Sequence, residues 1–278
     1  MKIYPEMIQG SKEWHEIRSG RPTTSQFGRI ITPSGEPSKQ AAGYMVELAA
    51  EQLIKDHERG PGEISSAMLA KLITPGKLAD SSAWEEIADT LIAECIRPDQ
   101  SATFDGNFDT DRGTEMEPVA RDEFSRIMKL EVIEVGFVTR EDGIVGCSPD
   151  GLIPNKSGVY VAGLEIKNPK AKHHVRYKID NILPQKYGPQ LHGGMAVTGL
   201  DHWYFTSRCE GMESLIIRVD RDGYTQKVSD ALDRFLIDYS NALPALKEKL
   251  REVHSRFMVY YQNRYQELVP MLRRKEAA

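Results

Sequence analysis

Hydrophobic residues in the middle of the chain fall into three consecutive runs rich in valine and isoleucine. These runs cover about residues 131–140, 143–153 and 157–167, and Gly, Asp and Pro residues punctuate them. β-Branched residues between turn residues are typical of strands. Two further runs of this kind lie at about 201–209 and 213–221. The sequence therefore predicts five strands.

Most of the remaining chain has apolar residues at helical spacing. Two short helical pieces are expected near the start, with Thr24 or Ser25 as a plausible N-cap of the second. A polar segment at 98–113 has no hydrophobic period, which indicates an exposed loop. Longer helices are expected at about 39–56, 114–129, 170–179, 183–199 and 224–274, the last with a break at Leu243–Pro244. Further helices, separated by T-P-G-K at 74–77, are expected around 66–96.

The order of these elements predicts a mixed α/β (α+β) fold. Helices come first, then three strands, further helices, two strands and a helical end, so one central sheet of about five strands would be flanked by helices. A length of 278 residues suits one large domain. We expect a single domain over residues 1–278, with a core at about 112–220 and helical extensions at 1–111 and 221–278.

The composition of the chain indicates its cellular compartment. No apolar run approaches the ~20 residues that span a bilayer, and the first residues lack the pattern of a signal peptide. A cytoplasmic protein without membrane contact is therefore expected. The three cysteines, Cys95, Cys147 and Cys209, are far apart. They cannot by themselves form a zinc ribbon or a four-cysteine iron–sulfur cluster.

The net charge of −5 argues, taken alone, against a nucleic-acid partner. The distribution of charge changes this picture, because basic residues concentrate between Glu165 and Gln190. Such a strip could follow a DNA backbone, and it could equally be the solvated face of a helix. The candidates for backbone contact in this strip are Lys170, Lys172 and Arg176.

Two short motifs carry the most specific chemical signal, C-S-P-D-G at 147–151 and L-E-I-K at 164–167. Asp150 lies in a turn after one expected strand. Glu165 and Lys167 are two apart on the next strand, so their side chains share a face while Ile166 points into the core. If the two strands pair, Asp150 and Glu165 converge. Carboxylates and a main-chain carbonyl are the hard ligands that Mg²⁺ prefers.

Each motif alone has an ordinary structural explanation. P-D-G is a common turn, and E-x-K on a strand is a common exposed pair. Their occurrence together, in this order on adjacent strands, favours a metal site. Glu115 and Glu117 are expected to open a helix, where the helix dipole favours acidic residues. Glu117 is also the better candidate for a third carboxylate that leans over this site.

These motifs resemble the phage lambda exonuclease family, also called YqaJ-type viral recombinases, within the PD-(D/E)xK nuclease superfamily. The resemblance extends from about residue 12 to residue 220 and implies a restriction-endonuclease-like core. The matching segments are W-H-E-I-R-S-G and T-T-S within 14–25, R-G-T-E-M-E at 112–117, G-C-S-P-D-G-L at 146–152, G-L-E-I-K at 163–167, P-Q-L-H-G-G-M-A-V-T at 189–198 and W-Y-F at 203–205.

The resemblance implies a role for each matching residue. Asp150, Glu165 and the carbonyl of Ile166 would coordinate one or two Mg²⁺ ions, which Mn²⁺ could replace, and Glu117 would assist them. Lys167 would position the attacking water, with support from Gln190. Arg18 and Ser25 would hold the 5′-phosphate of a DNA end. The ordinary alternatives are that Arg18 packs over Trp14 and that Ser25 caps a helix.

The same resemblance implies a function: degradation of one strand of duplex DNA from its 5′ end, which leaves a 3′ overhang. It also implies a ring of three subunits and a single-strand annealing protein as partner. One departure is Gly194, which stands where RecB-like relatives carry the tyrosine of a Q-x-x-x-Y motif after Gln190. Two alternatives stay open, a structure-specific or restriction-type endonuclease and a non-catalytic protein that binds DNA ends.

Overall fold

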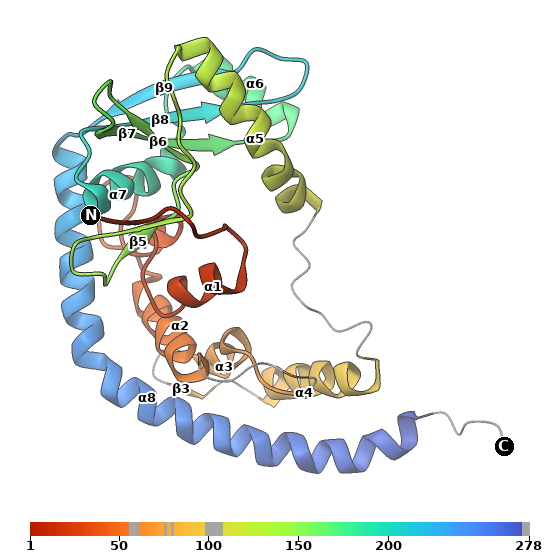
Figure 1. The fold of residues 1–278 in the computed structure, drawn as a ribbon. Helices are drawn as coiled ribbons and strands as arrows, with labels where there is room; N and C mark the ends of the chain where they lie inside the picture. The colour runs from red at the N-terminus through yellow and green to blue at the C-terminus, as the bar shows by residue number, and fades with distance from the viewer. Residues whose placement is uncertain (56–59, 61, 75–76, 79–80, 98–107, 274–278) are drawn as a thin grey trace. The chain divides into compact units, whose positions relative to one another are not determined.

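The computed structural model describes residues 1–55, 60, 62–74, 77–78, 81–97 and 108–273 (Figure 1). Contacts within the chain group it into two compact units. One comprises Met1–Ala41 and Gly106–Leu236, and the other comprises Ala42–Asp105 and Ile237–Ala278. The expectation of a single domain stays a prediction.

A four-stranded mixed sheet forms the centre of the first unit, in the order β6-β7-β8-β9 (Figure 1). Strands β6 (Gly151–Pro154) and β7 (Tyr160–Lys167) form an antiparallel hairpin. Strand β8 (His202–Ser207) runs parallel to β7, and β9 (Leu215–Asp220) is antiparallel to β8. The parallel step requires a crossover, which here contains helices α6 (Ala171–Asp180) and α7 (Gly188–Thr198) and the short 3₁₀ turn Gln185–Tyr187.

A smaller antiparallel sheet has the order β1-β4-β5. Its strands are β1 (Lys2–Tyr4), β4 (Phe137–Thr139) and β5 (Gly146–Cys147). The mixed α/β class predicted from the sequence is confirmed, but the strands belong to two sheets instead of one. The run at 143–153 divides into β5 and β6 because Pro149, which has no N–H to donate, interrupts the pairing. Strand β1 was not expected.

Helix α5 (Phe108–Met128) packs on the four-stranded sheet. Its Ala120 and Phe124 are fully buried against side chains of β6, β7 and β8, and the ring centroids of Phe124 and Tyr204 are 5.3 Å apart. The residues of this core cluster are Ala120, Phe124, Ile153, Ala162, Leu164, Ile166 and Tyr204. Ile166 thus points into the core, as strand alternation predicts.

Helix α7 packs against the indole of Trp203, which is 1% exposed. Gly163 on β7 and Gly194 on α7 both border this ring, and a Cβ added at either position would overlap its atoms. A large side chain at position 194 therefore has no room. This accounts for the departure from the Q-x-x-x-Y pattern: tryptophan from the sheet fills the space beside the helix.

The start of α5 corrects the predicted boundary at residue 114. The helix begins at Phe108, so the part of the expected loop at 108–113 is helical, and the rest of that loop lies outside the described residues. Glu117 consequently lies inside the helix and not in its first turn. The helix dipole, which acts mainly within a terminal turn, does not explain its presence.

Helix α8 (Gly223–Leu272) is continuous, so the predicted break at Leu243–Pro244 is wrong. A proline inside a helix removes one hydrogen bond and costs about 3 kcal/mol. Buried side chains on both sides of Pro244 offset that cost. They are Val228, Leu232 and Phe235 before it and Leu250, Val253 and Phe257 after it.

The two predicted helical pieces near the start are α1 (Lys12–Arg18) and a 3₁₀ helix, η1 (Thr24–Arg29). Ser11 caps α1 by accepting a hydrogen bond from the backbone N–H of Trp14 at 3.2 Å. The N-cap of η1 is Thr23, without a side-chain capping bond, so the capping role predicted for Thr24 or Ser25 is wrong.

The second unit contains α2 (Ala41–Ile54), α3 (Ser66–Lys71), α4 (Ser81–Ile96) and the later part of α8, with a small hairpin of β2 (Ile73–Thr74) and β3 (Lys77–Leu78). Trp84 of α4 packs edge-on against Phe257 of α8, with centroids 5.4 Å apart. Arg264 adds an ion pair to Asp89 at 2.9 Å. In the described part of the chain, no helix is both long and apolar enough to cross a membrane.

Candidate active site

The turn between β5 and β6 places Asp150 opposite Glu165, near the C-terminal end of β7. Its backbone N–H donates to the carbonyl of Leu164 at 3.0 Å, and its Oδ2 accepts a hydrogen bond from the backbone N–H of Ile166 at 2.5 Å. These bonds follow from the β6–β7 register, in which Gly151 pairs with Leu164. Only 8% of Asp150 and 3% of Glu165 is exposed. The predicted convergence of these carboxylates is therefore present.

Lys167 and Gln190 meet on one oxygen of Glu165. The Nζ of Lys167 lies 2.5 Å from Oε1 of Glu165, and Nε2 of Gln190 donates to the same atom at 2.7 Å. Strand alternation brings Lys167 to this face, and the first turns of α7 bring Gln190. The structure thus assembles three predicted residues around a single carboxylate oxygen.

Glu117 reaches the same cluster from α5. Burial raises the pKa of Glu117, while the nearby positive charges of Lys167 and Arg121 oppose that rise and the charge of Glu165 adds to it. Its charge also acts on Asp150. Asp150, Glu165, Lys167 and Glu117 therefore share one electrostatic environment.

This environment carries more negative than positive groups. Burial, followed by the charge of Glu165, raises the pKa of Asp150 well above its ordinary value. Burial lowers the pKa of Lys167, but Glu165 and Asp150 outweigh that effect and hold the pKa above the usual range. Three carboxyl groups thus face one ammonium group. A divalent cation would relieve their repulsion, and hard oxygen donors are the ligands that Mg²⁺ and Mn²⁺ prefer.

In this structure the carboxylates of the cluster are not arranged to bind a metal ion. Among the described residues, no three His, Cys, Asp or Glu side chains converge closely enough to hold a metal ion as they stand. Contacts within the cluster give the physical reason: Lys167 and Gln190 occupy Oε1 of Glu165, and a backbone N–H occupies Oδ2 of Asp150. The donor chemistry fits a divalent cation, and small rotations of these side chains would be needed to bind one.

A second polar cluster forms around Arg18. Its guanidinium donates to Oγ of Ser148 at 2.9 Å, to Oγ1 of Thr23 at 3.3 Å and to Oγ of Ser25 at 3.4 Å. The Cζ of Arg18 also lies 4.1 Å from the ring centroid of Trp14. Packing over Trp14, the ordinary alternative, is therefore present together with the predicted proximity of Arg18 and Ser25.

Ser148 is a candidate that sequence reasoning did not single out. Its Oγ accepts hydrogen bonds from Arg18 at 2.9 Å and from Nε1 of Trp14 at 3.0 Å. A hydroxyl has two acceptor sites and one hydrogen, so the O–H of Ser148 is left to donate elsewhere. Its position two residues before Asp150 in the C-S-P-D-G motif could have identified it as a candidate from the sequence. Ser148 connects the Arg18 cluster to the carboxylate cluster along the chain.

Side chains from outside the motifs hold the turn that carries Asp150. Nε of Arg121, on α5, donates to the carbonyl of Asp150 at 2.7 Å. Nε2 of Gln9 donates to the carbonyl of Pro149 at 3.2 Å. Arg121 is four residues after Glu117, a spacing that puts both on one face of a helix. That spacing could have pointed to Arg121, whereas Gln9 had no sequence signal.

The three candidates in the basic strip for contact with the DNA backbone lie at the start of α6 or within it. Lys170 is the N-cap of α6, Lys172 is exposed, and Nε of Arg176 pairs with Asp180 at 2.8 Å. A role of the three in binding the DNA backbone stays a prediction. The nearby His174 is buried, with Nδ1 2.8 Å from Oγ of Ser207, which is the arrangement of a structural histidine.

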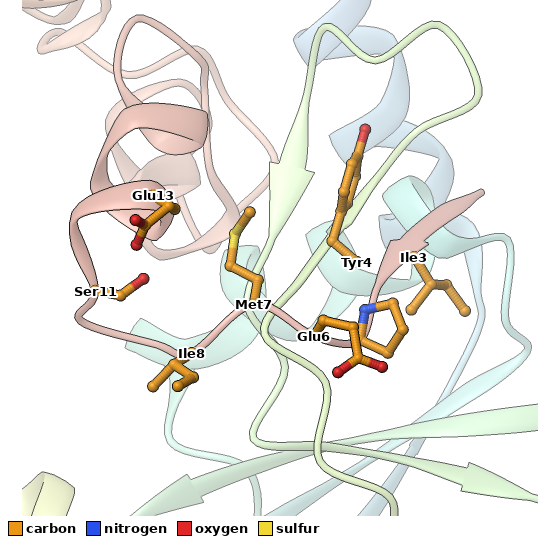
Figure 2. A pocket seen from close by; sticks show the side chains of 8 residues that line it. Ile3, Tyr4, Glu6, Met7, Ile8, Ser11 and Glu13 are labelled. Carbon is orange, nitrogen blue, oxygen red and sulfur yellow. The ribbon is translucent and has the colours of Figure 1, made fainter.

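A pocket of about 480 Å³ lies beside the segment that precedes α1 (Figure 2). Its lining is mainly apolar and contains no predicted site residue. The residues are Ile3, Tyr4, Pro5, Glu6, Met7, Ile8, Ser11 and Glu13. The predicted site residues gather instead at the β6–β7 hairpin, which is therefore the candidate site.

The fold and the two clusters define a mixed α/β protein with a buried carboxylate–lysine centre next to an arginine–hydroxyl cluster. Residues 13–201 match the model of the YqaJ-like viral recombinase domain. The match covers more than half of the 278 residues, so the chain belongs to this family. The resemblance drawn from the motifs is confirmed.

Solved structures support the fold. The chain is similar to the crystal structure of an alkaline exonuclease (LHK-Exo) from Laribacter hongkongensis, with a TM-score of 0.60, 21% identity, and coverage of 87% of this chain and 100% of that one. The complex of LHK-Exo with dAMP gives the same values. A phage-related exonuclease from Haemophilus somnus 129PT has a TM-score of 0.43, too low to support an argument, at 14% identity with 81% and 96% coverage. No curated protein matches the sequence.

Proposed function

We propose that this protein is a divalent-metal-dependent DNA exonuclease that hydrolyses one strand of duplex DNA from its 5′ end. The observation that carries the proposal is the meeting of Asp150, Glu165 and Lys167 at the β6–β7 hairpin, in a member of the YqaJ-like viral recombinase family. The similarity in fold to a protein described as an alkaline exonuclease, also crystallised with dAMP, supports a deoxynucleotide polymer as substrate.

Asp150, Glu165, Glu117 and the main-chain carbonyl of Ile166 would hold one or two Mg²⁺ ions, with Mn²⁺ as a substitute. When bound, such a cation supplies a Lewis acid for the phosphate at which hydrolysis occurs. The excess of carboxylates over ammonium groups in this buried cluster is the reason for expecting it.

Lys167 is suited to orient water and to stabilise negative charge on the phosphate. Its pKa is held above the usual range, so it stays charged at neutral pH and acts as a fixed donor. Gln190 bonds the same oxygen of Glu165 and thereby limits where both side chains can point. Donors that are fixed in advance cost little reorganisation when charge develops on the phosphate.

The Arg18 cluster supports the 5′ polarity. Arg18 supplies a positive charge, and the hydroxyls of Ser25 and Ser148 lie within hydrogen-bonding distance of it. These are the groups that recognise a terminal phosphate. Only Pro149 separates Ser148 from Asp150, so a 5′-phosphate held here would place the first phosphodiester bonds near the carboxylates. The resulting 3′ overhang, a ring of three subunits and a single-strand annealing partner follow from the family resemblance.

The test compares linear duplex DNA labelled at the 5′ or the 3′ end with a closed circle of the same sequence. We expect early release of 5′-labelled mononucleotide with Mg²⁺ or Mn²⁺, no release with EDTA, and an intact circle. Cleavage of the circle would instead establish an endonuclease. If the protein binds ends but shortens no DNA with either cation, it is a non-catalytic end-binding protein and the proposal is wrong.

A further inference from the structure

Arg121 makes two short contacts at the edge of the carboxylate cluster. Its Nε donates to the main-chain carbonyl of Asp150 at 2.7 Å, and its NH1 lies 2.7 Å from Oε2 of Glu134. The side chain of Arg121 is only 12% exposed, whereas that of Glu134 is 60% exposed. The guanidinium is therefore buried against the turn and directed there by a carboxylate at the surface.

The turn has one backbone donor fewer than usual, because Pro149 has no N–H. Asp150 is held on its N–H side by the carbonyl of Leu164, and Arg121 holds its carbonyl. Fixing the carbonyl fixes the rotation of the backbone at Asp150, and that rotation sets the direction of the carboxylate. A displacement of ~1 Å in reacting groups can reduce catalysis by ~10²-fold.

Helix α5 gives Arg121 a rigid base. Ala120 and Phe124, on either side of it in the sequence, are fully buried against the four-stranded sheet. Arg208, which follows β8, ties α5 to the same end of the sheet: its Nε bonds Glu123 at 2.9 Å, and its backbone N–H bonds the carbonyl of Lys167 at 2.9 Å. Arg121 thus fixes the turn relative to a helix that is packed on the sheet.

We propose that Arg121 is a positioning residue, which acts through the main-chain carbonyl of Asp150 to set the orientation of that carboxylate, with Glu134 orienting the guanidinium. The inference rests on the proposed function. It assigns Arg121 no contact with DNA, because its side chain is only 12% exposed and its Nε and NH1 each bond a protein oxygen.

The experiment compares Arg121→Lys, Arg121→Gln and Glu134→Gln with wild type. Arg218→Gln is the matched control, because Arg218 is an arginine paired with Asp220 on β9 and its side chain is 54% exposed. The measurements are kcat and KM on 5′-phosphorylated duplex DNA, the Kd for DNA ends in EDTA, the affinity for Mn²⁺ by calorimetry, and the melting temperature.

We expect kcat to fall about 10–100-fold in Arg121→Gln and less in Arg121→Lys, since removing the outer contacts of a metal ligand has effects of this size. KM and the Kd in EDTA should stay within about twofold of wild type, and Mn²⁺ affinity should fall with kcat. Glu134→Gln should have a smaller effect, and Arg218→Gln none. If Arg121→Gln melts below the assay temperature, the inference is tested with Arg121→Lys, on the same changes in kcat, KM, Kd and Mn²⁺ affinity.

A wild-type kcat in the deciding variant would overturn the inference. A loss confined to KM and to the Kd in EDTA would also overturn it, because Arg121 would then contact DNA. If wild type cleaves nothing, the proposed function fails, and Mn²⁺ affinity still tests the positioning role. Equal Mn²⁺ affinity in wild type and the deciding Arg121 variant would then count against it.

Discussion

The ammonium group of Lys167 lies 2.5 Å from Oε1 of Glu165, the same oxygen that accepts a hydrogen bond from Gln190. One carboxylate oxygen is therefore shared by a charged and a neutral donor inside a cluster of acids. The pairing keeps Lys167 protonated and holds it where the chain brings Asp150 and Glu117 together. It makes Lys167 a group whose removal should affect chemistry more than DNA binding.

Lys167→Ala should reduce kcat by about 10²–10³-fold or more, the usual effect of removing one donor that stabilises developing charge. Binding to DNA ends in EDTA should be retained, because Lys167 is a single half-buried group that is already paired with Glu165. Lys156→Ala, at an exposed position in the turn between β6 and β7, is the control and should keep kcat near wild type. Equal losses of DNA binding and cleavage in Lys167→Ala would contradict this role.

Arg18→Ala should remove the preference for a 5′-phosphate. A hydrogen bond to a charged group contributes about 1.5–3 kcal/mol, so kcat/KM on phosphorylated ends should fall by roughly 10–100-fold. Ends with a 5′-hydroxyl should be affected much less, and Ser148→Ala should give a smaller change of the same kind. Rates measured on paired substrates that differ only in the phosphate decide the matter. A uniform loss on both substrates would show that Arg18 is a general structural residue.

The parts of the site that lie on one hairpin could be predicted from sequence. Strand alternation fixes Glu165 and Lys167 to one face, and antiparallel pairing of neighbouring strands brings Asp150 to them. The contact of Arg18 with Ser25 was expected only from the family resemblance. The contacts of Arg121 and Gln9 with the turn depend on how α5 and the first residues pack, which no local pattern specifies.

The errors in the fold have local physical causes. The run at 143–153 has β-branched residues near both ends and so looks like one strand, but Pro149 divides it between two sheets. Pro244 suggested a helix end, yet packing on both sides keeps α8 intact. The residues before Glu117 are polar without a period, so the earlier start of α5 could not be read from them.

Gly194→Ala should destabilise the protein, because the added methyl group would overlap the indole of Trp203. Overpacking of a core commonly costs about 1–3 kcal/mol. Gly43→Ala is a matched control: Gly43 is also helical, and a Cβ there would meet no atom within 4 Å. It should be neutral or stabilising by up to about 1 kcal/mol. Urea unfolding of both variants tests the contrast, which disappears if the α7–Trp203 packing is absent in solution.

His192 should make the protein less stable as the pH falls below neutrality. Burial lowers the pKa of His192 from its ordinary 6.5, and the charge of Asp222, 3.5 Å away, only partly opposes this effect. The unfolded chain therefore takes up a proton near pH 6.5 while the folded chain still resists it. Stability is full above that pH and decreases from about 6.5 down to the lower pKa of the folded state.

His192→Asn should weaken this pH dependence. An asparagine amide can replace the bond between Nδ1 of His192 and Oγ1 of Thr225, which is 2.8 Å long, but it does not titrate. His202, whose pKa is also lowered by burial, keeps part of the effect in both proteins. Free energies of unfolding in urea at pH 7.5 and 5.5 should therefore drop less in the variant than in wild type. An equal drop in both would mean that His192 binds its proton as readily in the folded chain as in the unfolded one.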